Sequence, residues 1–391
     1  MAAKNNREAA LSLWIIFQIG LLVFLLFPLS IALWNTRALK GLGDYTFLPR
    51  FPRVSLLVPV RNEEDNIGPC LRSLLKQTYP DFKVIALDDN STDDTWSVLE
   101  ELAKKDQRLT VVKGDPLPDG WLGKHWACHQ LFQLADGELV VFTDADTHHE
   151  PDTMNCAVAA LLAENADLVT AFPKQRVLSW AERLAVPVVP WSIFSFLPLA
   201  LSHRLKTPRI SFGSGAYMLF TRASYEMIGG HSSVRDNIVD DLALAKRIKS
   251  INLRLRILDG TKHVSCRMYK DFHQVIDGFG KNLFAAFDNN IPLFMFIWLW
   301  IGLVFIEPPI FILYGLLGSG VNAFSMLLAG GTIVLSIILW GLTYQRFKFR
   351  IWLAGLYPIT VVFFIVIAIR SMILTLTGKT SWKDRDIRSS G

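Results

Sequence analysis

The chain has 391 residues, more than one domain needs, and 51% of them are hydrophobic. The mean hydropathy of +0.31 comes from clustered apolar residues, which membrane-spanning segments explain better than one very large core. The formal charge of +5 is modest, and the basic residues lie near the apolar blocks rather than in one dense tract. This distribution argues against nucleic acid as a partner and favours a membrane surface.

The cysteines are too scattered to indicate a zinc site or a disulfide framework. Cys70, Cys128, Cys156 and Cys266 lie far apart, and none belongs to a Cys-x-x-Cys pair. We therefore expect four buried thiols in a reducing compartment.

The first apolar run covers residues 11–34 and is long enough to cross a bilayer. Lys4 and Arg7 precede it, as in a signal peptide, but the run is longer than a signal peptide's apolar region and lacks a clear cleavage site. We interpret residues 1–36 as an uncleaved transmembrane anchor. The basic residues that follow predict that the next segment is cytoplasmic: Arg37, Lys40, Arg50 and Arg53.

From Arg53 to about Lys174, within an expected domain of residues 50–270, short apolar runs alternate with helical patterns. The expected strands are 54–60, 82–87, 109–112, 138–143 and 168–172, and the expected helices are 64–77, 93–105, 124–134 and 151–164. Such alternation is typical of an α/β domain with a mostly parallel sheet and helices on both faces.

Residues 177–205 interrupt this alternation with an apolar insert that contains Pro187, Pro190 and Pro198. As a membrane span, the insert would put the carboxylates before and after it on opposite sides. We therefore expect broken helices at the cytoplasmic membrane face, with Trp180 and Trp191 at headgroup depth. A hairpin buried in the protein core is the alternative.

After the insert, residues 210–220 are expected to form a strand and residues 240–250 a helix. Gly213 and Gly215 within this strand would let a ligand or another backbone segment approach closely.

The last part of the chain, residues 271–391, begins as an amphipathic segment and then contains candidate spans at 293–317, 324–342 and 351–376. Three full spans after a cytoplasmic domain would leave the tail outside the cell, against the positive-inside rule. Glu307-Pro308-Pro309 can break the first candidate into a re-entrant pair, which would return the tail to the cytoplasm. The basic residues of this tail are Lys379, Lys383, Arg385 and Arg388.

The chemistry-bearing residues follow the strands. Asp144-Ala145-Asp146 comes directly after the strand 138–143, at the edge where open α/β sheets bind ligands. Two hard carboxylate ligands there suit Mg²⁺ or Mn²⁺ together with substrate phosphates.

Two further polar stretches close the first two strands: Pro59-Val60-Arg61-Asn62-Glu63 and the run from Asp88 to Thr95. Capping of the next helix explains Ser91 to Asp94. It explains Asp88 and Asp89 less well, because adjacent carboxylates repel each other unless something binds there.

Together with Gly123-Lys124 at a helix start, these motifs resemble family 2 inverting glycosyltransferases over residues 54–269. The resemblance implies an A-type glycosyltransferase fold, Rossmann-like with a mostly parallel sheet. It also implies that Pro59, Glu63 and the turn of Asp88 and Asp89 hold the uracil and ribose of a UDP-sugar. Asp144 and Asp146 would bind ribose and a divalent ion on the diphosphate, with Asp146 as the main ligand.

Lys124 has two interpretations, a cation beside the phosphates or a solvated residue at a helix start. A metal that bridges the phosphates would stabilise the charge developing on the leaving UDP.

An inverting transfer also needs a base that deprotonates the acceptor. The family supplies this base from a Glu-Asp motif ahead of a helix, and here Val239-Asp240-Asp241-Leu242 occupies that place. We assign Asp241 as the base and Asp240 as its helper, with ordinary N-capping as the alternative. His231 in Gly229-Gly230-His231 is expected to be a structural hydrogen-bonding residue rather than the base.

Chain-extending members carry Gln-x-x-Arg-Trp after this helix. Here the corresponding region, Val264 to Tyr269, keeps only Arg267 and a displaced aromatic residue. Arg267 can still clamp a diphosphate. The loss of Gln and Trp argues against processive polymer synthesis.

The sequence therefore predicts a multi-pass membrane hexosyltransferase whose catalytic domain, residues 50–270, is cytoplasmic. It would move one sugar from a UDP-sugar to a lipid-like hydroxyl or carboxyl acceptor. The tail, Trp382-Lys383-Asp384-Arg385, resembles the Trp-Lys-Gly-Arg tail of glycosyltransferases that act on carotenoids, hopanoids and ceramide, with Asp in place of Gly. A processive polysaccharide synthase and a non-catalytic membrane scaffold are the alternatives.

Overall fold

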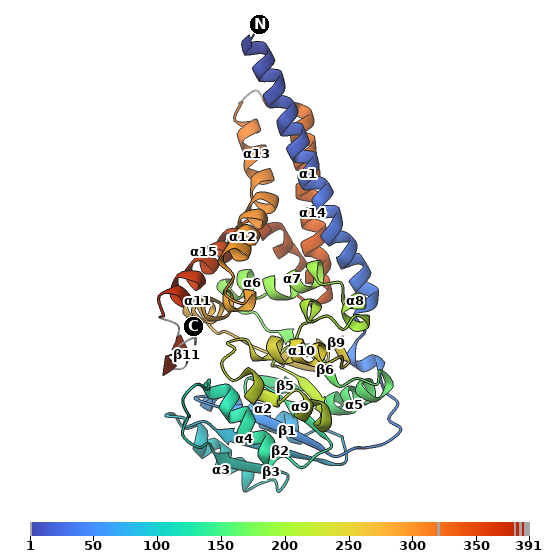
Figure 1. Ribbon diagram of the computed structural model, residues 1–391, viewed down its shortest axis with the longest axis vertical. Helices are drawn as coiled ribbons and strands as arrows, with labels where there is room; N and C mark the ends of the chain where they lie inside the picture. The colour runs from blue at the N-terminus through green and yellow to red at the C-terminus, as the bar shows by residue number, and fades with distance from the viewer. Residues whose placement is uncertain (1, 319–320, 379–380, 383–384, 387–391) are drawn as a thin grey trace. The chain divides into compact units, whose positions relative to one another are not determined.

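The computed structural model describes residues 2–318, 321–378, 381–382 and 385–386, and it divides the chain into two compact units (Figure 1). The helical unit comprises Met1–Arg37, Leu178–Pro198 and Asp271–Ile373. The sheet unit comprises Ala38–Val177, Leu199–Lys270 and Leu374–Gly391. All the residues predicted to bind the donor or to act in catalysis belong to the sheet unit.

The helical unit is built from long apolar helices and several shorter ones. Its helices are α1 (Ala2–Ala38), α6 (Trp180–Ala185), α7 (Val188–Phe196), α11 (Phe272–Asn282), η4 (Ala285–Phe287), α12 (Ile291–Phe305), α13 (Glu307–Leu316), α14 (Ala323–Arg346), η5 (Ile351–Leu356) and α15 (Tyr357–Leu376). Among the described residues, four stretches are long and apolar enough to cross a membrane: Leu13–Ala38, Ile291–Leu316, Ala323–Arg346 and Ile351–Leu376. They agree with the predicted spans to within a few residues, and the side on which the sheet unit lies stays a prediction.

The predicted break at Glu307-Pro308-Pro309 is confirmed, because α12 ends at Phe305 and α13 begins at Glu307. Proline has no backbone N–H to continue the ladder of α12, whereas the first turn of a new helix tolerates it. The carboxylate of Glu307 accepts hydrogen bonds at 2.8 and 3.0 Å from the side-chain amide of Gln18 in α1. Whether the two helices form a re-entrant pair stays a prediction.

Part of the basic tail, Lys379, Lys383, Asp384 and Arg388, lies outside the described residues. The described part contains the short antiparallel strands β11 (Ser381–Trp382) and β12 (Arg385–Asp386).

The insert forms broken helices, as predicted: α6 and α7 in the helical unit and α8 (Leu199–Arg204) in the sheet unit. The breaks fall at Pro187 and Pro198. An interfacial position for Trp191 is not supported, because it is 1% exposed and stacks on Trp340 of α14 with a centroid distance of 4.2 Å. The reason is that α7 is apolar on all sides and is therefore enclosed by other helices. Trp180 is exposed, and its depth in the membrane stays a prediction.

The sheet unit contains the remaining elements. Its strands are β1 (Val54–Val60), β2 (Phe82–Asp88), β3 (Leu109–Lys113), β4 (Leu139–Phe142), β5 (Thr147–His149), β6 (Leu168–Phe172), β7 (Lys174–Gln175), β8 (Met218–Thr221), β9 (Leu255–Asp259) and β10 (Val264–Cys266). Its helices, besides α8, are η1 (Leu42–Asp44), α2 (Glu64–Leu75), α3 (Thr95–Ala103), α4 (Gly123–Leu134), α5 (Thr153–Ala163), η2 (Pro208–Ile210), α9 (Arg222–Met227), η3 (Gly230–Val234) and α10 (Asp240–Ser250).

Seven strands form the main sheet in the order β3-β2-β1-β4-β8-β6-β9. The neighbouring pairs are parallel except where β8 runs antiparallel between β4 and β6. The predicted α/β class with a mostly parallel sheet is therefore confirmed. A second sheet, β5-β10-β7, was not predicted from the sequence.

Both faces of the main sheet are covered, because its strands are apolar on both sides. On one face, alternate residues such as Leu56 and Val58 join a buried cluster with side chains of α2, α3 and α5. On the other face, Phe142 and Phe220 pack against Tyr225 of α9, which also contacts Phe132 of α4.

The predicted strand 210–220 is wrong over most of its length, since only Met218–Thr221 is a strand. The backbone before it makes other hydrogen bonds. Ser214 donates its backbone N–H to the hydroxyl of Thr170, and Gly215 donates to the carboxylate of Asp241. Glycine has low strand propensity, so the segment forms a loop beside these groups.

Asn35 of α1 provides a test of the packing within the helical unit. Its side-chain amide is fully buried and donates at 2.8 Å to the carbonyl oxygens of Phe194 and Leu197 at the end of α7, where helical carbonyls lack partners. We expect Asn35→Leu to lower the free energy of unfolding by about 1–3 kcal/mol, because two carbonyl oxygens at the end of α7 lose their shared donor. The measurement is denaturant unfolding of the purified protein in detergent. Ser30→Ala, which removes an exposed hydrogen bond within α1, is the control and should change little.

Candidate active site

The site begins where three parallel strands end at the same edge of the sheet. Val60 at the end of β1 pairs with Asp88 at the end of β2, and β4 ends beside them at Phe142. The segments that carry Glu63, Asp89 and Asp144 therefore leave the sheet side by side, at the edge where ligands bind in this class of fold.

The loops after β1 and β2 hold each other through hydrogen bonds. Arg61 donates to the carbonyl oxygens of Asp89 and Asn90 at 2.6 and 2.9 Å. The backbone N–H of Glu63 donates to the hydroxyl of Thr95 at 2.8 Å. These bonds fix the loop that carries Glu63 against the loop that carries Asp89.

Asp88 and Asp89 are both buried, and each has a local partner. One carboxylate oxygen of Asp88 accepts the backbone N–H of Ser91 at 3.2 Å, so turn formation accounts for Asp88 better than the sequence suggested. Asp89 donates its own N–H to the carbonyl of Val60 at 2.7 Å. Pro59 lies one residue before the end of β1, in register with Leu87.

The buried hydroxyl groups of Thr143 and Thr147, the residues on either side of the turn from Asp144 to Asp146, make hydrogen bonds that fix it. The hydroxyl of Thr147 donates to the carbonyl of Asp144 at 2.8 Å, and that of Thr143 donates to the carbonyl of Ala216, also at 2.8 Å. Burial, followed by the charges of Asp144 and Glu63, raises the pKa of Asp146 to about 7. Three carboxylates that repel one another fit a divalent cation, because a cation relieves the repulsion and hard oxygen ligands suit Mg²⁺ and Mn²⁺.

Lys124, in the first turn of α4, bridges two of the acidic segments. Its ammonium nitrogen lies 2.7 Å from Oδ1 of Asp144 and 3.4 Å from Oδ2 of Asp240. Burial alone would lower the pKa of Lys124, but the two carboxylates hold it well above its usual value. Lys124 is therefore a paired cation inside the site, and the interpretation as a solvated helix-start residue is wrong.

Asp240 and Asp241 form the first turn of α10, and their surroundings differ. Burial would raise the pKa of Asp240, but Lys124 and His231 hold it well below its usual range. Burial, and then the neighbouring charge of Asp240, raise the pKa of Asp241 to about 7. The carboxylate of Asp241 accepts the N–H of Leu242 at 2.7 Å and that of Gly215 at 2.9 Å. The N-cap residue of α10 is Val239, which makes no side-chain hydrogen bond, so N-capping does not account for Asp241.

Gly213 and Gly215 permit the close approach that the sequence suggested. A Cβ atom at Gly213 would overlap the carbonyl oxygen of Asp241, and one at Gly215 would lie 2.9 Å from Oδ2 of Asp144 and 3.1 Å from Nζ of Lys124. Gly215 therefore brings Asp144, Lys124 and Asp241 to one place.

His231 supports Asp240, in agreement with the expected structural role. Its Nε2 lies 3.8 Å from Oδ2 of Asp240, and its Nδ1 lies 2.6 Å from the hydroxyl of Tyr225. The same hydroxyl accepts the backbone N–H of His231 at 3.0 Å, so Tyr225 holds the ring and the backbone of His231 together.

His125 and Tyr225 were missed in the sequence. Burial lowers the pKa of His125 to about 4, and its Nε2 donates to the carbonyl of Asn237 at 2.8 Å. In the sequence, only its position next to Lys124 could have indicated a role for His125 in the site. Nothing beyond its aromatic character could have indicated one for Tyr225.

Arg267 reaches the site through the second sheet. Cys266 at the end of β10 pairs with Thr147 of the antiparallel strand β5. Arg267, which follows Cys266, therefore lies beside Asp146, which precedes Thr147. The guanidinium of Arg267 donates to the carbonyl of Lys270 at 3.1 Å. Its role as a clamp on a diphosphate stays a prediction.

Another group with metal-ligand chemistry lies apart from this turn. Donor atoms of Asp152, Cys156 and His263 lie within 4.8 Å of one another. Asp152 is exposed, and its carboxylate already faces Nε2 of His263 at 3.7 Å. An Asp–His contact is sufficient to explain this group.

Comparison with known proteins points to the same part of the chain as the geometry does. Residues 55–229 match the family model described as glycosyl transferase family 2. The sheet unit contains a family 2 glycosyltransferase domain. The matched residues include every predicted donor-site residue except Arg267, and they end before Asp240 and Asp241.

The glycosyltransferase domain also has curated relatives. The chain is 25% identical over 251 residues to a 4,4'-diaponeurosporenoate glycosyltransferase of Staphylococcus haemolyticus, covering 63% of this chain and 65% of that protein. It is 29% identical to the protein of that name from Staphylococcus aureus strain USA300, covering 62% and 64%. The match therefore spans slightly under two thirds of these relatives.

Among solved structures, the fold resembles a mannosyltransferase of Pyrobaculum calidifontis in complex with GDP-mannose and Mn²⁺. The TM-score is 0.57 at 20% identity, with 95% of this chain and 100% of that chain covered. This likeness confirms the predicted fold class for the glycosyltransferase domain.

Removal of the charge at Lys124 tests how the glycosyltransferase domain is held together. We expect Lys124→Met to lower the free energy of unfolding by about 1–3 kcal/mol, because Asp144 and Asp240 lose their shared cation. Lys105→Met is the matched control, since its ion pair with Glu101 is exposed and such pairs contribute about 1 kcal/mol or less. Denaturant unfolding at pH 7.5 measures both, and equal losses in the two variants would contradict a central role for Lys124.

Proposed function

We propose that this protein is a membrane-bound inverting glycosyltransferase that moves one hexose from a UDP-sugar to a lipid-like acceptor at the cytoplasmic membrane face. The observation that carries the proposal is the convergence of acidic residues from distant segments on one edge of the sheet. Asp144 and Asp240 share the ammonium group of Lys124, and Asp241 is joined to the same place by Gly215.

The donor would lie across the ends of β1, β2 and β4. Pro59, Glu63, Asp88 and Asp89 would surround the nucleoside, because their loops are fixed against each other at this edge. Asp144 and Asp146 would hold Mg²⁺ or Mn²⁺, which when bound stabilises negative charge on the diphosphate as a Lewis acid. Lys124 and Arg267 add positive charge on the same side.

Asp241 would act as the base. As the bond between the sugar carbon and the leaving phosphate oxygen breaks, the acceptor oxygen bonds to that carbon and its proton passes to Asp241. A raised pKa suits this task, since the carboxylate must take up a proton and later release it. Asp240, held ionised by Lys124, would keep the neighbouring backbone and His231 in place.

The acceptor is proposed from the relatives and from the apolar helices. The names of the staphylococcal relatives specify 4,4'-diaponeurosporenoate, a carotenoid-type acceptor. Four apolar stretches able to cross a membrane support an acceptor that resides in the lipid phase. A carboxylate acceptor arrives without a proton, whereas a hydroxyl acceptor requires the base.

The alternatives remain those raised by the sequence. A processive synthase is disfavoured because the Gln-x-x-Arg-Trp motif is absent around Arg267. A non-catalytic scaffold is disfavoured because the acidic residues are paired and oriented, as the bonds to Asp240 and Asp241 indicate.

Lipid labelling tests the proposal. Membranes that contain the protein would be incubated with radiolabelled UDP-glucose, UDP-N-acetylglucosamine, UDP-galactose and GDP-mannose, and then extracted with organic solvent. We expect label from one UDP-sugar in the extract, dependent on Mg²⁺ or Mn²⁺. Label from GDP-mannose alone would contradict the UDP donor, and intact UDP binding without any transfer would favour the scaffold.

Replacement of the proposed base separates binding from chemistry. With a hydroxyl acceptor, Asp241→Asn should keep UDP binding and reduce transfer by about 10²–10⁴-fold, because the amide cannot accept the proton. Asp236→Asn, at an exposed carboxylate shortly before α10, is the matched control and should transfer at the normal rate. Transfer by Asp241→Asn at the control rate would exclude Asp241 as the base.

The pH dependence follows from the direction of the Asp241 shift. A base works only when it is deprotonated, so a pKa of about 7 predicts that transfer falls as the pH drops below about 7 and levels off above it. Initial rates between pH 5 and 9 with a hydroxyl acceptor provide the measurement. A rate that is constant down to pH 5 would contradict the assignment.

A further inference from the structure

The sheet unit contains a polar cavity at the opposite end of α10 from the acidic pair. Its volume is about 350 Å³, within the range of roughly 300–1,000 Å³ that is usual for ligand pockets. Asp240 begins α10 and Lys249 lies near its end, about 14 Å away at a rise of about 1.5 Å per residue. The cavity is therefore separate from the donor site.

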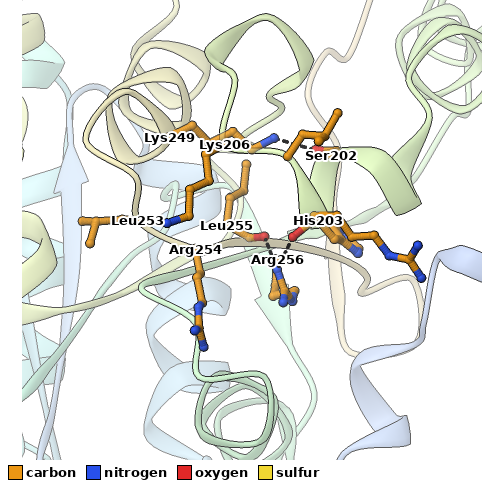
Figure 2. Close-up of a pocket in the computed structure, with 10 residues that line it drawn as sticks. Ser202, His203, Lys206, Lys249, Leu253, Arg254, Leu255 and Arg256 are labelled. Atoms are coloured by element: carbon orange, nitrogen blue, oxygen red, sulfur yellow. Dashed lines mark hydrogen bonds between the residues drawn. The ribbon is translucent and has the colours of Figure 1, made fainter.

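The lining of this basic pocket comes from α8, the residues that follow it, the end of α10 and the start of β9 (Figure 2). It is rich in cations: Arg204, Lys206, Lys249, Arg254 and Arg256, with His203 beside them. No acidic residue is among the side chains that line it in the part of the chain that the structure describes.

Two acidic residues lie near the pocket, and Arg256 is the one lining cation that forms an ion pair with either of them among the described residues. Glu164 pairs with Arg256 at 3.0 Å. The carboxylate of Asp167 accepts the backbone N–H of Arg254 at 2.8 Å rather than its guanidinium group. The side chains of Arg204, Lys206 and Arg254 make no hydrogen bond or ion pair with any described residue.

Lys249 gives the strongest indication of an anionic ligand. Its side chain is buried, 2% exposed, and its ammonium group donates to the hydroxyl of Ser202 at 3.1 Å (Figure 2). It also donates to the carbonyl of Ile210 at 2.7 Å. Neither partner carries a negative charge. Burial, and then the charge of Arg256, lower the pKa of Lys249 to about 8. A buried ammonium group without a counter-charge is costly, and an anion in the adjoining cavity would supply that charge.

We propose that the basic pocket binds a phosphate group. Phosphate accepts several hydrogen bonds at once, which suits a pocket lined by both arginine and lysine. Lys249 also has a third N–H, besides the two that bond to Ser202 and Ile210, which a phosphate oxygen can accept. Arg254 and Arg204 offer planar forks for phosphate oxygens, and Lys206 and Lys249 act as point charges. The phosphate can belong to a membrane phospholipid or to a soluble compound, and both have the same recognition chemistry.

Neutralisation of two unpaired cations tests the pocket. Lys206→Gln combined with Arg254→Gln removes two exposed charges that make no side-chain bonds with described residues, so the fold should be kept. Arg209→Gln is the matched control, because Arg209 is exposed in the neighbouring η2 and does not line the pocket. The full-length protein would be used in neutral detergent with EDTA, which removes metal-dependent phosphate binding at Asp144 and Asp146.

Two probes separate the sources of the phosphate. Retention of added phosphatidylglycerol would be measured by native mass spectrometry, and binding of inorganic phosphate by calorimetry. We expect the double variant to bind at least one probe about tenfold more weakly than the wild type and Arg209→Gln. A loss restricted to phosphatidylglycerol identifies a lipid headgroup, and a loss restricted to inorganic phosphate identifies a soluble ligand.

Equal binding by all three proteins in both assays, or no binding by the wild type, would overturn the proposal. Because the readout is binding, the result does not depend on whether the protein transfers a sugar.

Discussion

The sheet unit depends on one cation held between carboxylates that are far apart in the sequence. Lys124 at the start of α4 joins Asp144 after β4 to Asp240 at the start of α10. Without it, Asp144 and Asp240 would lose the cation that they share, and the repulsion among the carboxylates at this edge would oppose folding. The helix dipoles act in the same direction, because the two aspartates lie in the first turn of α10, where negative charge is favoured.

The same arrangement makes two adjacent aspartates chemically different. Asp240 is ionised by its contact with Lys124, and its fixed charge raises the proton affinity of Asp241. Two neighbouring groups with pKa values shifted in opposite directions are typical of sites where one residue exchanges protons and the other stays charged. Gly215 completes the arrangement, since its N–H orients the carboxylate of Asp241 and its missing side chain leaves room for Asp144.

The sequence predicted the alternating half of the sheet unit well. The strand at 54–60 and the helix at 240–250 have the predicted bounds, because buried parallel strands and amphipathic helices have strong patterns. It did not predict the loop before β8, where the backbone N–H of Gly215 donates to the carboxylate of Asp241 instead of pairing with a neighbouring strand. Nor did it predict β5 and β10, which are three residues each and too short to show a period.

The acidic residues of the site were found from motifs, but their partners were not. Nothing in the local sequence indicates that Lys124 bridges Asp144 and Asp240, because that pairing depends on how distant segments meet. The support of His231 by Tyr225 has the same origin, as does the uncompensated charge of Lys249. Patterns in sequence identify elements and ligand types, and tertiary contacts decide which charges are shared.

The antiparallel strand β8 has a consequence for how such proteins diversify. The chain leaves the sheet after β6, passes through α6 and α7, and returns as β8, which is hydrogen-bonded directly to β6 through pairs such as Leu168 and Phe220. The excursion thus starts and finishes on adjacent strands. Its length and composition can change over generations while the pairing of β6 with β8 is kept, so this segment can vary without rebuilding the sheet that carries the carboxylates.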